Sequence, residues 1–290
     1  YQRTGLTYRP AVRLVGVGQR VANNLIHDGA HSAIILNGND HVIEYNEIHT
    51  VCTMSGDAGA FYLGRDLTER GNIVRYNYFH NLQPVAGRHG FHDVMGVYLD
   101  DCASGTTVIG NVFRNVSRAV MVGGGRDNTI ENNVFLGCTV NIHFDARATT
   151  WAKKWWNGQD NTLVDRLKAV RHDQPPYSER YPRLGNVLNE RPEWPAGNRI
   201  AHNIIVGKRL LTLLDKVQES DLELEDNLVT AESPFVDAAA GNFELKPDAQ
   251  GSISGYKPIP FSQIGPDHRP AMPVPQHTPT QEQNFQPDPD

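Results

Sequence analysis

The sequence lacks three features that would each have pointed to a class of protein. It has no excess of positive charge, because 27 Lys and Arg stand against 33 Asp and Glu and give a net charge of −6. We therefore expect no nucleic-acid partner. No apolar run approaches membrane-spanning length, so we expect no membrane contact. The three cysteines are odd in number and follow no metal-ligand spacing, which favours small, buried packing residues.

Two common repeat architectures are also excluded. A leucine-rich horseshoe needs a column of leucines, and helical repeats need long stretches with an apolar residue every three to four positions. The sequence has neither pattern. A repeat of another kind is nevertheless present.

That repeat is marked by seven asparagines, each followed two residues later by an apolar or aromatic residue. Two of the intervals between these asparagines are 22 residues, and the others are longer. A period in the low twenties is typical of a solenoid, in which each repeat is one coil that buries its apolar face against its neighbours. An asparagine column at a corner of the coil can hydrogen-bond from rung to rung. The seven are Asn24, Asn46, Asn77, Asn111, Asn133, Asn203 and Asn227.

Each asparagine is accompanied by a short apolar run that alternates with period two and ends in Gly or a polar residue, as a strand does. One such run per 22-residue coil, stacked in register, predicts an all-β fold. We expect a right-handed parallel β-helix of about seven coils. The inward column should be Val12, Ile34, Phe61, Val97, Val120 and Ile142, and the outward column Arg13, Ile35, Tyr62, Tyr98, Met121 and His143.

The departures from the period predict where the coil carries inserted loops. The distance from Asn to strand is nine or ten residues in plain coils, but it is 15 before Phe61 and 20 before Val97. A larger insertion, 148–197, contains all four tryptophans. Long loops in a compact repeat usually serve function. We expect these insertions to flank one sheet and form a cleft.

The chain divides into two parts by composition. Residues 1–257 form the predicted β-helix domain, and residues 258–290 hold nine prolines and no repeat, which is typical of an extended tail. The chain begins with Tyr rather than Met. We interpret it as a processed or truncated piece of a secreted or periplasmic protein whose signal peptide is not in this chain, and we expect a monomer.

Two aspartates fall in one column just past the strand residues. That column reads Asn37, Gly64, Asp100, Gly123 and Asp145. Strands about 4.8 Å apart place Asp100 and Asp145 about 9.6 Å apart at the backbone, and Gly123 should leave the space between them open. Side-chain lean could bring the carboxyls to the separation of about 6.5–9.5 Å found in inverting glycosidases. One carboxyl would then protonate the leaving oxygen and the other activate water. Asp101 could replace Asp100, and the alternative is that these are solvated turn residues.

The side chains near this column suit a sugar ligand. Tyr62 and Tyr98 offer ring faces, and His143 either contacts substrate or tunes a carboxyl. Arg147 either holds an acidic group or pairs with Asp101. Trp151 either stacks on a sugar or packs the insertion onto the coil.

The long loop before Val97 adds polar side chains to the predicted cleft. We expect Arg88, His89 and His92 to line its wall. A His-x-x-His-Asp run can bind metal, but the third and fourth ligands are missing, so we predict no metal site. Gly123, Gly124 and Gly125 should leave the floor of the cleft free of side chains and turn backbone N–H groups toward the ligand.

Three motifs carry a resemblance to a family of enzymes. They are Tyr98–Gly105 (YLDDCASG), Gly123–Asn128 (GGGRDN) and His143–Arg147 (HFDAR). In this order they resemble the right-handed parallel β-helix proteins of bacterial polysaccharide degradation, and above all glycoside hydrolase family 141, which includes α-L-fucosidase and xylanase activities. The resemblance covers about residues 10–260 and implies a pair of catalytic aspartates at Asp100 and Asp145. The Asp100–Asp101 pair is also similar to that of polygalacturonases, but their Gly-His-Gly and Arg-Ile-Lys signatures are absent.

Three functions remain open at this point. The first is a glycoside hydrolase that acts on a polysaccharide or oligosaccharide without a cofactor. The second is a polysaccharide lyase, which needs Ca²⁺ or an arginine to neutralise a uronate and a base such as Arg88, Arg147, His143 or Tyr98. The third is a non-catalytic carbohydrate-binding solenoid.

Overall fold

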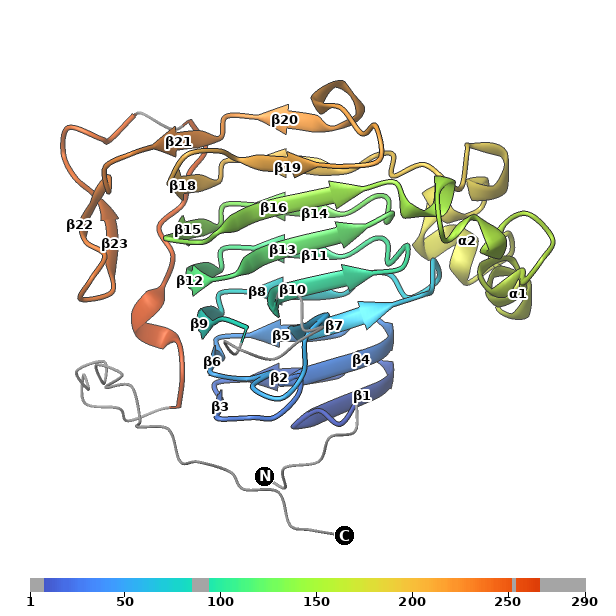
Figure 1. Cartoon of the computed structure of the whole chain (residues 1–290), viewed down its shortest axis with the longest axis horizontal. Coiled ribbons are helices and arrows are strands. Elements are labelled where there is room, and N and C mark those ends of the chain that lie inside the picture. Colours follow the sequence, from blue (N-terminus) through green and yellow to red (C-terminus); the bar gives the residue numbers. More distant parts are fainter. Residues whose placement is uncertain (1–7, 85–93, 252–253, 267–290) are drawn as a thin grey trace, which may run out of the picture.

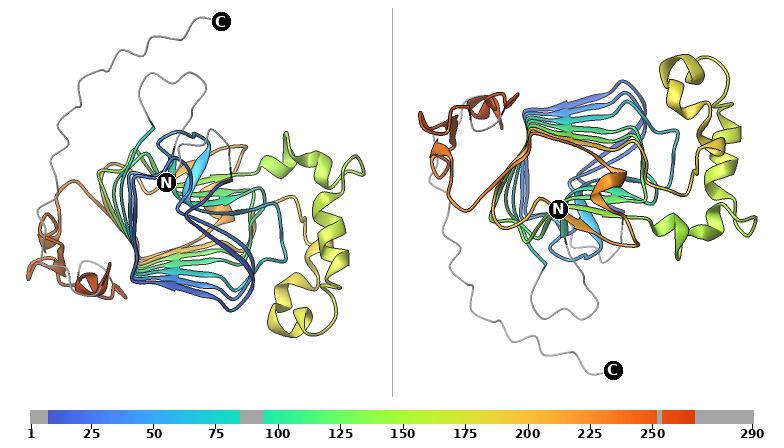
Figure 2. Two further views of the ribbon diagram at one scale, coloured as in Figure 1. Left: turned by 90° about the horizontal axis from the view of Figure 1, so that it is seen from below. Right: turned by 90° about the horizontal axis from the view of Figure 1, so that it is seen from above.

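The computed structural model describes residues 8–84, 94–251 and 254–266. Three parallel sheets of seven strands each wind around one apolar interior, and each coil contributes one strand to each sheet in turn. Figure 1 shows the coils stacked from β1 at one end to β20 and β21 at the other, and Figure 2 looks along the stack.

The strands of the three sheets are short, and their bounds follow the coil order. The first sheet comprises β1 (Val12–Val17), β4 (Ile34–Asn39), β7 (Ala58–Gly64), β10 (Val94–Asp100), β13 (Arg118–Gly123), β16 (Val140–Asp145) and β19 (Leu211–Leu213). The second sheet comprises β2 (Arg20–Ala22), β5 (Val42–Glu44), β8 (Ile73–Arg75), β11 (Thr107–Ile109), β14 (Thr129–Glu131), β17 (Arg199–Ala201) and β20 (Glu223–Glu225). The third sheet comprises β3 (Leu25–His27), β6 (Glu47–His49), β9 (Tyr78–Leu82), β12 (Val112–Val116), β15 (Val134–Leu136), β18 (Ile204–Val206) and β21 (Leu228–Thr230).

The predicted asparagine column is confirmed, and it forms the corner that leads into the third sheet. From Asn46 onward, each Oδ1 accepts hydrogen bonds from the backbone N–H and the side-chain amide of the preceding ladder asparagine, at 2.9–3.1 Å. The residue before every ladder asparagine has a positive φ, and only Gly110 among these seven is a glycine. The asparagine bonds therefore hold a left-handed turn that side chains rarely adopt without compensation.

The predicted inward column is also confirmed by strand pairing. Ile34, Phe61, Val97, Val120 and Ile142 are fully buried and lie in register. In the third sheet, Phe79, Phe113 and Phe135 stack inside with ring centroids 5.2 and 5.1 Å apart. Such ladders let each coil bury its apolar face against the next, which is the main source of stability in a solenoid.

The 148–197 insertion contains the α-helices of the described chain and lies beside the corner between the first and second sheets. Its apolar side chains pack against Cys102 and Leu67 of the coil. Figure 2 shows it projecting on one side of the stack, opposite the C-terminal segment. Its elements are η1 (Arg147–Thr149), η2 (Lys153–Trp155), α1 (Thr162–Ala169), α2 (Tyr177–Arg180), η3 (Pro182–Leu184) and η4 (Val187–Asn189).

The coils end at β21, after the short η5 (Glu219–Asp221). An antiparallel pair, β22 (Phe235–Asp237) and β23 (Asn242–Leu245), and then η6 (Phe261–Gln263) pack on the outer face of the third sheet. There Phe235, Phe243 and Ile259 bury Val112 and Val134. Within the described residues, no helix is both long and apolar enough for a membrane span.

All three cysteines are free, and Cys52 and Cys102 are buried. Burial raises the pKa of Cys52 and of Cys138 to about 12, so both are neutral thiols near neutral pH. This agrees with the packing role expected from the sequence.

Candidate functional site

The strand register places Asp100, Gly123 and Asp145 in one column at the ends of β10, β13 and β16. Asp100 pairs with Gly64 and Gly123 pairs with Asp145. The two carboxyl groups therefore stand two rungs apart on the outward side of the first sheet, beside the corner where the insertion begins. Their side chains are 11% and 9% exposed, so the pair is mostly shielded from solvent.

The space above Gly123 is filled, contrary to the prediction that it would be open. A Cβ atom at Gly123 would lie 2.3 Å from Cζ of Arg147. The glycine is therefore needed to admit the guanidinium of Arg147, which lies between the two aspartates.

Arg147 binds both carboxyl groups. Its Nη2 lies 2.7 Å from Oδ2 of Asp145, and its Nε donates to Oδ1 of the same group at 3.0 Å. Its Nη1 donates to Oδ1 of Asp100 and, at 3.3 Å, to Oδ1 of Asp101. Burial alone would lower the pKa of Arg147, but its hydrogen bonds with Asp145 and the surrounding carboxylates raise it, so it is a permanent cation.

Asp101 is held by a second arginine that sequence reasoning did not find. Arg65 donates through Nη2 to Oδ2 of Asp101 at 2.6 Å and stacks over Trp155 at 5.0 Å. Asp101 is 2% exposed and has a positive φ of 42°. It therefore positions the two arginines instead of facing a ligand.

The environments of the two column aspartates push their pKa values apart. Burial and the neighbouring charge of Asp101 raise the pKa of Asp100 to about 6. Burial would also raise the pKa of Asp145, but hydrogen bonds from His143 and Arg147 and the charge of Arg147 outweigh it and lower the pKa to about 2. Near pH 5, Asp100 is mostly protonated and Asp145 is ionised, which is the division of labour that acid–base catalysis requires.

The two predicted tyrosines lie on the outward face and contact carboxyl groups. Tyr62 donates its O–H to Oδ2 of Asp100 at 3.0 Å, and Tyr98 donates to Oδ1 of Asp57 at 3.0 Å. The two rings meet edge to face with centroids 5.4 Å apart. Burial, and then the charge of Asp100, raises the pKa of both phenols, so neither is a good proton acceptor at neutral pH.

His143 lies against a carboxyl group, which is the contact that the second of its two expected roles requires. Its Nε2 lies 3.3 Å from Oδ2 of Asp145, and Nδ1 lies 3.4 Å from Nη1 of Arg118. At 1% exposed, it orients the carboxyl group of Asp145.

The four tryptophans take different positions. Trp155 is buried in the insertion's own cluster, and Trp156 packs against that cluster, while Trp194 packs against the main core. Trp151 alone is strongly exposed, at 59%, and its ring lies 5.8 Å from Cζ of Arg147. An exposed indole beside a polar cluster is a suitable surface for a sugar ring.

The three glycines after Val122 do not provide an open floor. Gly125 lies so close to the carbonyl of Ala103 that a Cβ atom would be 1.9 Å from its oxygen. The N–H of Gly124 donates to the carbonyl of Asp145. These glycines allow close packing between coils, and the predicted ligand-facing N–H at Gly124 is engaged within the fold.

The ambiguity over the sixth coil is settled by strand pairing. Leu211 pairs with Ile142 and Leu213 with Phe144, so Asp215 falls one position beyond the column of Asp145. Arg88, His89 and His92 lie outside the described residues, and their predicted place in the cleft wall stays a prediction.

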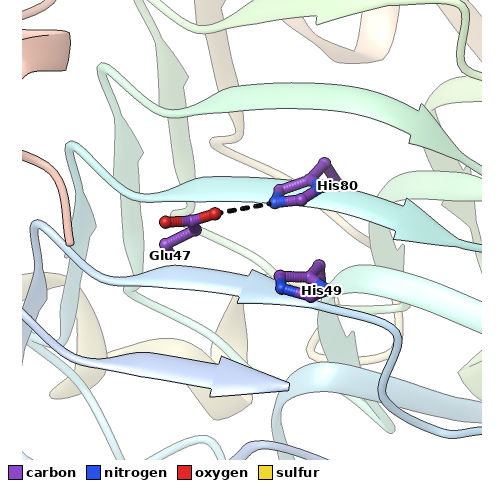
Figure 3. Close-up of side chains that lie close together, drawn as sticks. All are labelled: Glu47, His49 and His80. Carbon is purple, nitrogen blue, oxygen red and sulfur yellow. Dashed lines mark hydrogen bonds and ion pairs between the residues drawn. The ribbon is translucent and has the colours of Figure 1, made fainter. Parts of the chain in front are cut away.

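A second polar cluster lies on the third sheet and was missed by sequence reasoning, which predicted no metal site. Glu47, His49 and His80 each offer one ligand atom, and these atoms all lie within 4.8 Å of one another. Figure 3 shows them on adjacent strands. A signal was available, since His27, His49 and His80 each follow a ladder asparagine by three residues.

Comparison with known proteins supports the fold and does not identify a specific relative. Residues 10–135 match a family model described as "Right handed beta helix region". Neither the curated proteins nor the solved structures give a significant match. Together with the three parallel sheets, the match shows that this chain is an all-β, right-handed parallel β-helix.

Proposed function

We propose that the protein is a carbohydrate-active enzyme, a glycoside hydrolase of the inverting type with a site related to that of family 141. The observation that carries the proposal is the pair of buried aspartates in one column, two rungs apart and both bound to Arg147. Their surroundings push the pKa of Asp100 up, to about 6, and that of Asp145 down, to about 2. The β-helix match agrees with it at a coarser level, because this fold is common among enzymes that act on polysaccharides.

In the proposed reaction, Asp100 is the general acid and Asp145 the general base. Asp100 gives its proton to the glycosidic oxygen as the bond from that oxygen to the anomeric carbon breaks. Water attacks the anomeric carbon from the opposite side and passes its proton to the carboxylate of Asp145. Arg147 keeps Asp145 ionised and holds both carboxyls in place, and Trp151 offers an exposed ring for the sugar.

The alternative of a polysaccharide lyase is less well supported by the same contacts. A lyase needs a side chain that removes a proton from the sugar. Arg147 is held as a cation by its carboxylates, the pKa of Tyr98 is raised, and His143 is engaged by Asp145 and Arg118. Ca²⁺ would have a role only in the lyase reaction, where it would neutralise the uronate carboxylate.

The substrate and setting belong to the same proposal. A polysaccharide or oligosaccharide is the expected ligand, and a secreted or periplasmic location would bring the enzyme to such polymers. We propose that it acts as a monomer.

The test is a panel of polysaccharides digested with the purified protein and assayed for both reducing ends and ultraviolet absorbance. A hydrolase releases reducing ends alone, whereas a lyase also forms an unsaturated product that absorbs. Asp100→Asn and Asp145→Asn should each lower kcat by about 10²–10⁴-fold. Glu44→Gln is the matched control, because Glu44 is also buried and paired with arginine but lies on the second sheet.

Two results would count against this assignment. Full hydrolytic activity in either aspartate variant would remove that residue from catalysis. Sugar binding without any turnover, unchanged in both variants, would favour a carbohydrate-binding solenoid.

A further inference from the structure

The outward face of the third sheet carries a short column of imidazoles. His27 pairs with His49 and His49 with His80, on β3, β6 and β9. The ring centroids are 5.1 and 4.5 Å apart, and the ring of Tyr78 stacks on His80 at 4.2 Å. The column is on a different sheet from the aspartate pair and plays no part in the proposed hydrolysis.

A carboxylate joins two of these imidazoles. Glu47 precedes His49 by two residues on the same strand, so both side chains point to the outer face. Oε1 of Glu47 lies 3.2 Å from Nε2 of His80, as Figure 3 shows, and the two side chains are 18% and 8% exposed. The Nδ1 of His49 contacts the hydroxyl of Thr50 at 3.0 Å, so Nε2 is the ring nitrogen left to bind a metal ion.

Stacking alone does not require this arrangement. The Phe79–Phe113–Phe135 ladder and the Tyr45–Tyr76 pair stack at similar distances through rings other than imidazole. At the histidine column, by contrast, two imidazoles and one carboxylate bring their ligand atoms within 4.8 Å of one another. Two histidines and one glutamate form a ligand set typical of zinc sites that keep a fourth position open.

The three ligand atoms need to move only a short way toward one another to bind one zinc ion. Bonds of about 2.0–2.2 Å in a tetrahedral site place ligand atoms about 3.3 Å apart. Rotation of the side chains on fixed strands can provide the remaining shift.

We propose that Glu47, His49 and His80 bind one Zn²⁺ ion, with the fourth position taken by water or an added ligand. His27 is not part of the site, because its Nδ1 lies 2.7 Å from Oδ2 of Asp28 and it falls outside the three-residue cluster. On the far side of His80, the next rung of the column is Arg114, a permanent cation that does not ligate metal, so the ligand set ends at His80.

The experiment is a calorimetric titration of the chelator-treated full chain with Zn²⁺. We expect one ion per chain and a melting temperature that rises with Zn²⁺ concentration, because the ion binds only the folded state. His49→Asn and His80→Asn should each weaken Zn²⁺ binding by about 100-fold or more. Loss of a residue that only supports a ligand costs up to about 100-fold, and loss of the ligand itself should cost at least as much. His27→Asn is the matched control and should change affinity less than about threefold.

A second probe does not depend on the histidine variants folding normally. Co²⁺ in place of Zn²⁺ should give the visible absorption of a four-coordinate site in the wild type. Glu47→Gln, which keeps the size and shape of the side chain, should alter that spectrum and weaken Zn²⁺ binding. The proposal is overturned if the wild type binds no Zn²⁺, or if His27→Asn weakens binding as much as His49→Asn. It is also overturned if Glu47→Gln leaves both the Co²⁺ spectrum and the Zn²⁺ affinity unchanged.

Discussion

Two buried clusters of carboxyls and arginines lie on the outer faces of neighbouring sheets, and they differ in their balance of charge. On the second sheet, Glu44 alone is shared by Arg20 and Arg75, each at 2.6 Å. On the first sheet, three carboxyls share two arginines, Arg147 and Arg65. The Glu44 cluster therefore has one more arginine than carboxyls, whereas the cluster on the first sheet has one more carboxyl than arginines.

The difference explains why only one cluster contains a carboxyl that titrates near neutral pH. Burial opposes ionisation of Glu44, but hydrogen bonds and charge from its two arginines lower its pKa. At Asp100, burial and the charge of Asp101 prevail over its share of Arg147 and raise the pKa to about 6. A structural cluster is thus expected to hold enough cations to keep its carboxyl ionised, whereas a buried carboxyl with a strongly raised pKa is a candidate for a functional site.

The largest expected effect comes from removing the shared cation. Arg147→Met should destabilise the fold by about 3–5 kcal/mol at neutral pH, because it leaves the buried Asp100 and Asp145 without the cation that they share. Arg75→Met should cost at most about 1 kcal/mol, since the side chain of Arg75 is 40% exposed and Arg20 still binds Glu44. Urea unfolding of both variants measures the contrast.

The same pair of variants also has a pH signature. Without Arg147, the carboxyls take up protons more readily, so the loss in stability should shrink as the pH falls from 7 to 4. Equal losses in the two variants, or a loss for Arg147→Met that is independent of pH, would contradict the prediction. The first-sheet cluster would then depend on its arginine no more than an ordinary surface ion pair does.

A smaller effect is expected from the opposite pKa shifts of Asp100 and Glu44. The pKa of Asp100 is raised above its unfolded value of about 3.9, so its ionisation opposes folding, and stability is lost as the pH rises through about 6. The pKa of Glu44 is lowered, so its contribution is present at neutral pH and lost as the pH falls below about 4.

The two amide variants should therefore diverge with pH. Asp100→Asn should gain stability relative to the wild type between pH 4 and pH 7, by up to about 3 kcal/mol for a shift of two units. Glu44→Gln should lose stability over the same range. Melting temperatures measured at both pH values test this, and parallel curves for the two variants would contradict it.

Most of the fold could be predicted from the sequence because the coil repeats one physical unit. The asparagine at each corner satisfies the same backbone groups in every coil, so its spacing also marks the strands. Counting residues from the ladder asparagines correctly placed Asp100, Gly123 and Asp145 in one column. It left only Asp215 ambiguous, because Leu211 and Thr212 were both acceptable strand starts until pairing with Ile142 selected the leucine.

The arrangement of side chains within the site was harder to predict. Gly123 was interpreted as open space, yet it admits the guanidinium of Arg147, and a repeat pattern does not show which long side chain reaches across a glycine. Arg65 was missed because it comes from a different coil than the aspartate it binds. The histidine column, by contrast, follows the ladder asparagines by a constant three residues, and a search at that offset would have found it.

The smallest expected effect concerns the fine tuning of Asp100. The O–H of Tyr62 donates to Oδ2 of Asp100 at 3.0 Å, and a hydrogen bond donated to a carboxylate favours the charged form. Tyr62→Phe should raise the pKa of Asp100 further, by about 0.5–1 unit, because one such bond contributes about 0.5–1.5 kcal/mol. If Asp100 is the general acid, the alkaline limb of the pH–kcat/KM profile should move up by that amount while the acidic limb stays fixed. The control is Tyr78→Phe, which alters a tyrosine on the third sheet and should leave both limbs in place. If the alkaline limb stayed fixed in Tyr62→Phe but moved in Asp101→Asn, Asp101 and not Asp100 would be the general acid. The comparison with Glu44 would then apply to Asp101.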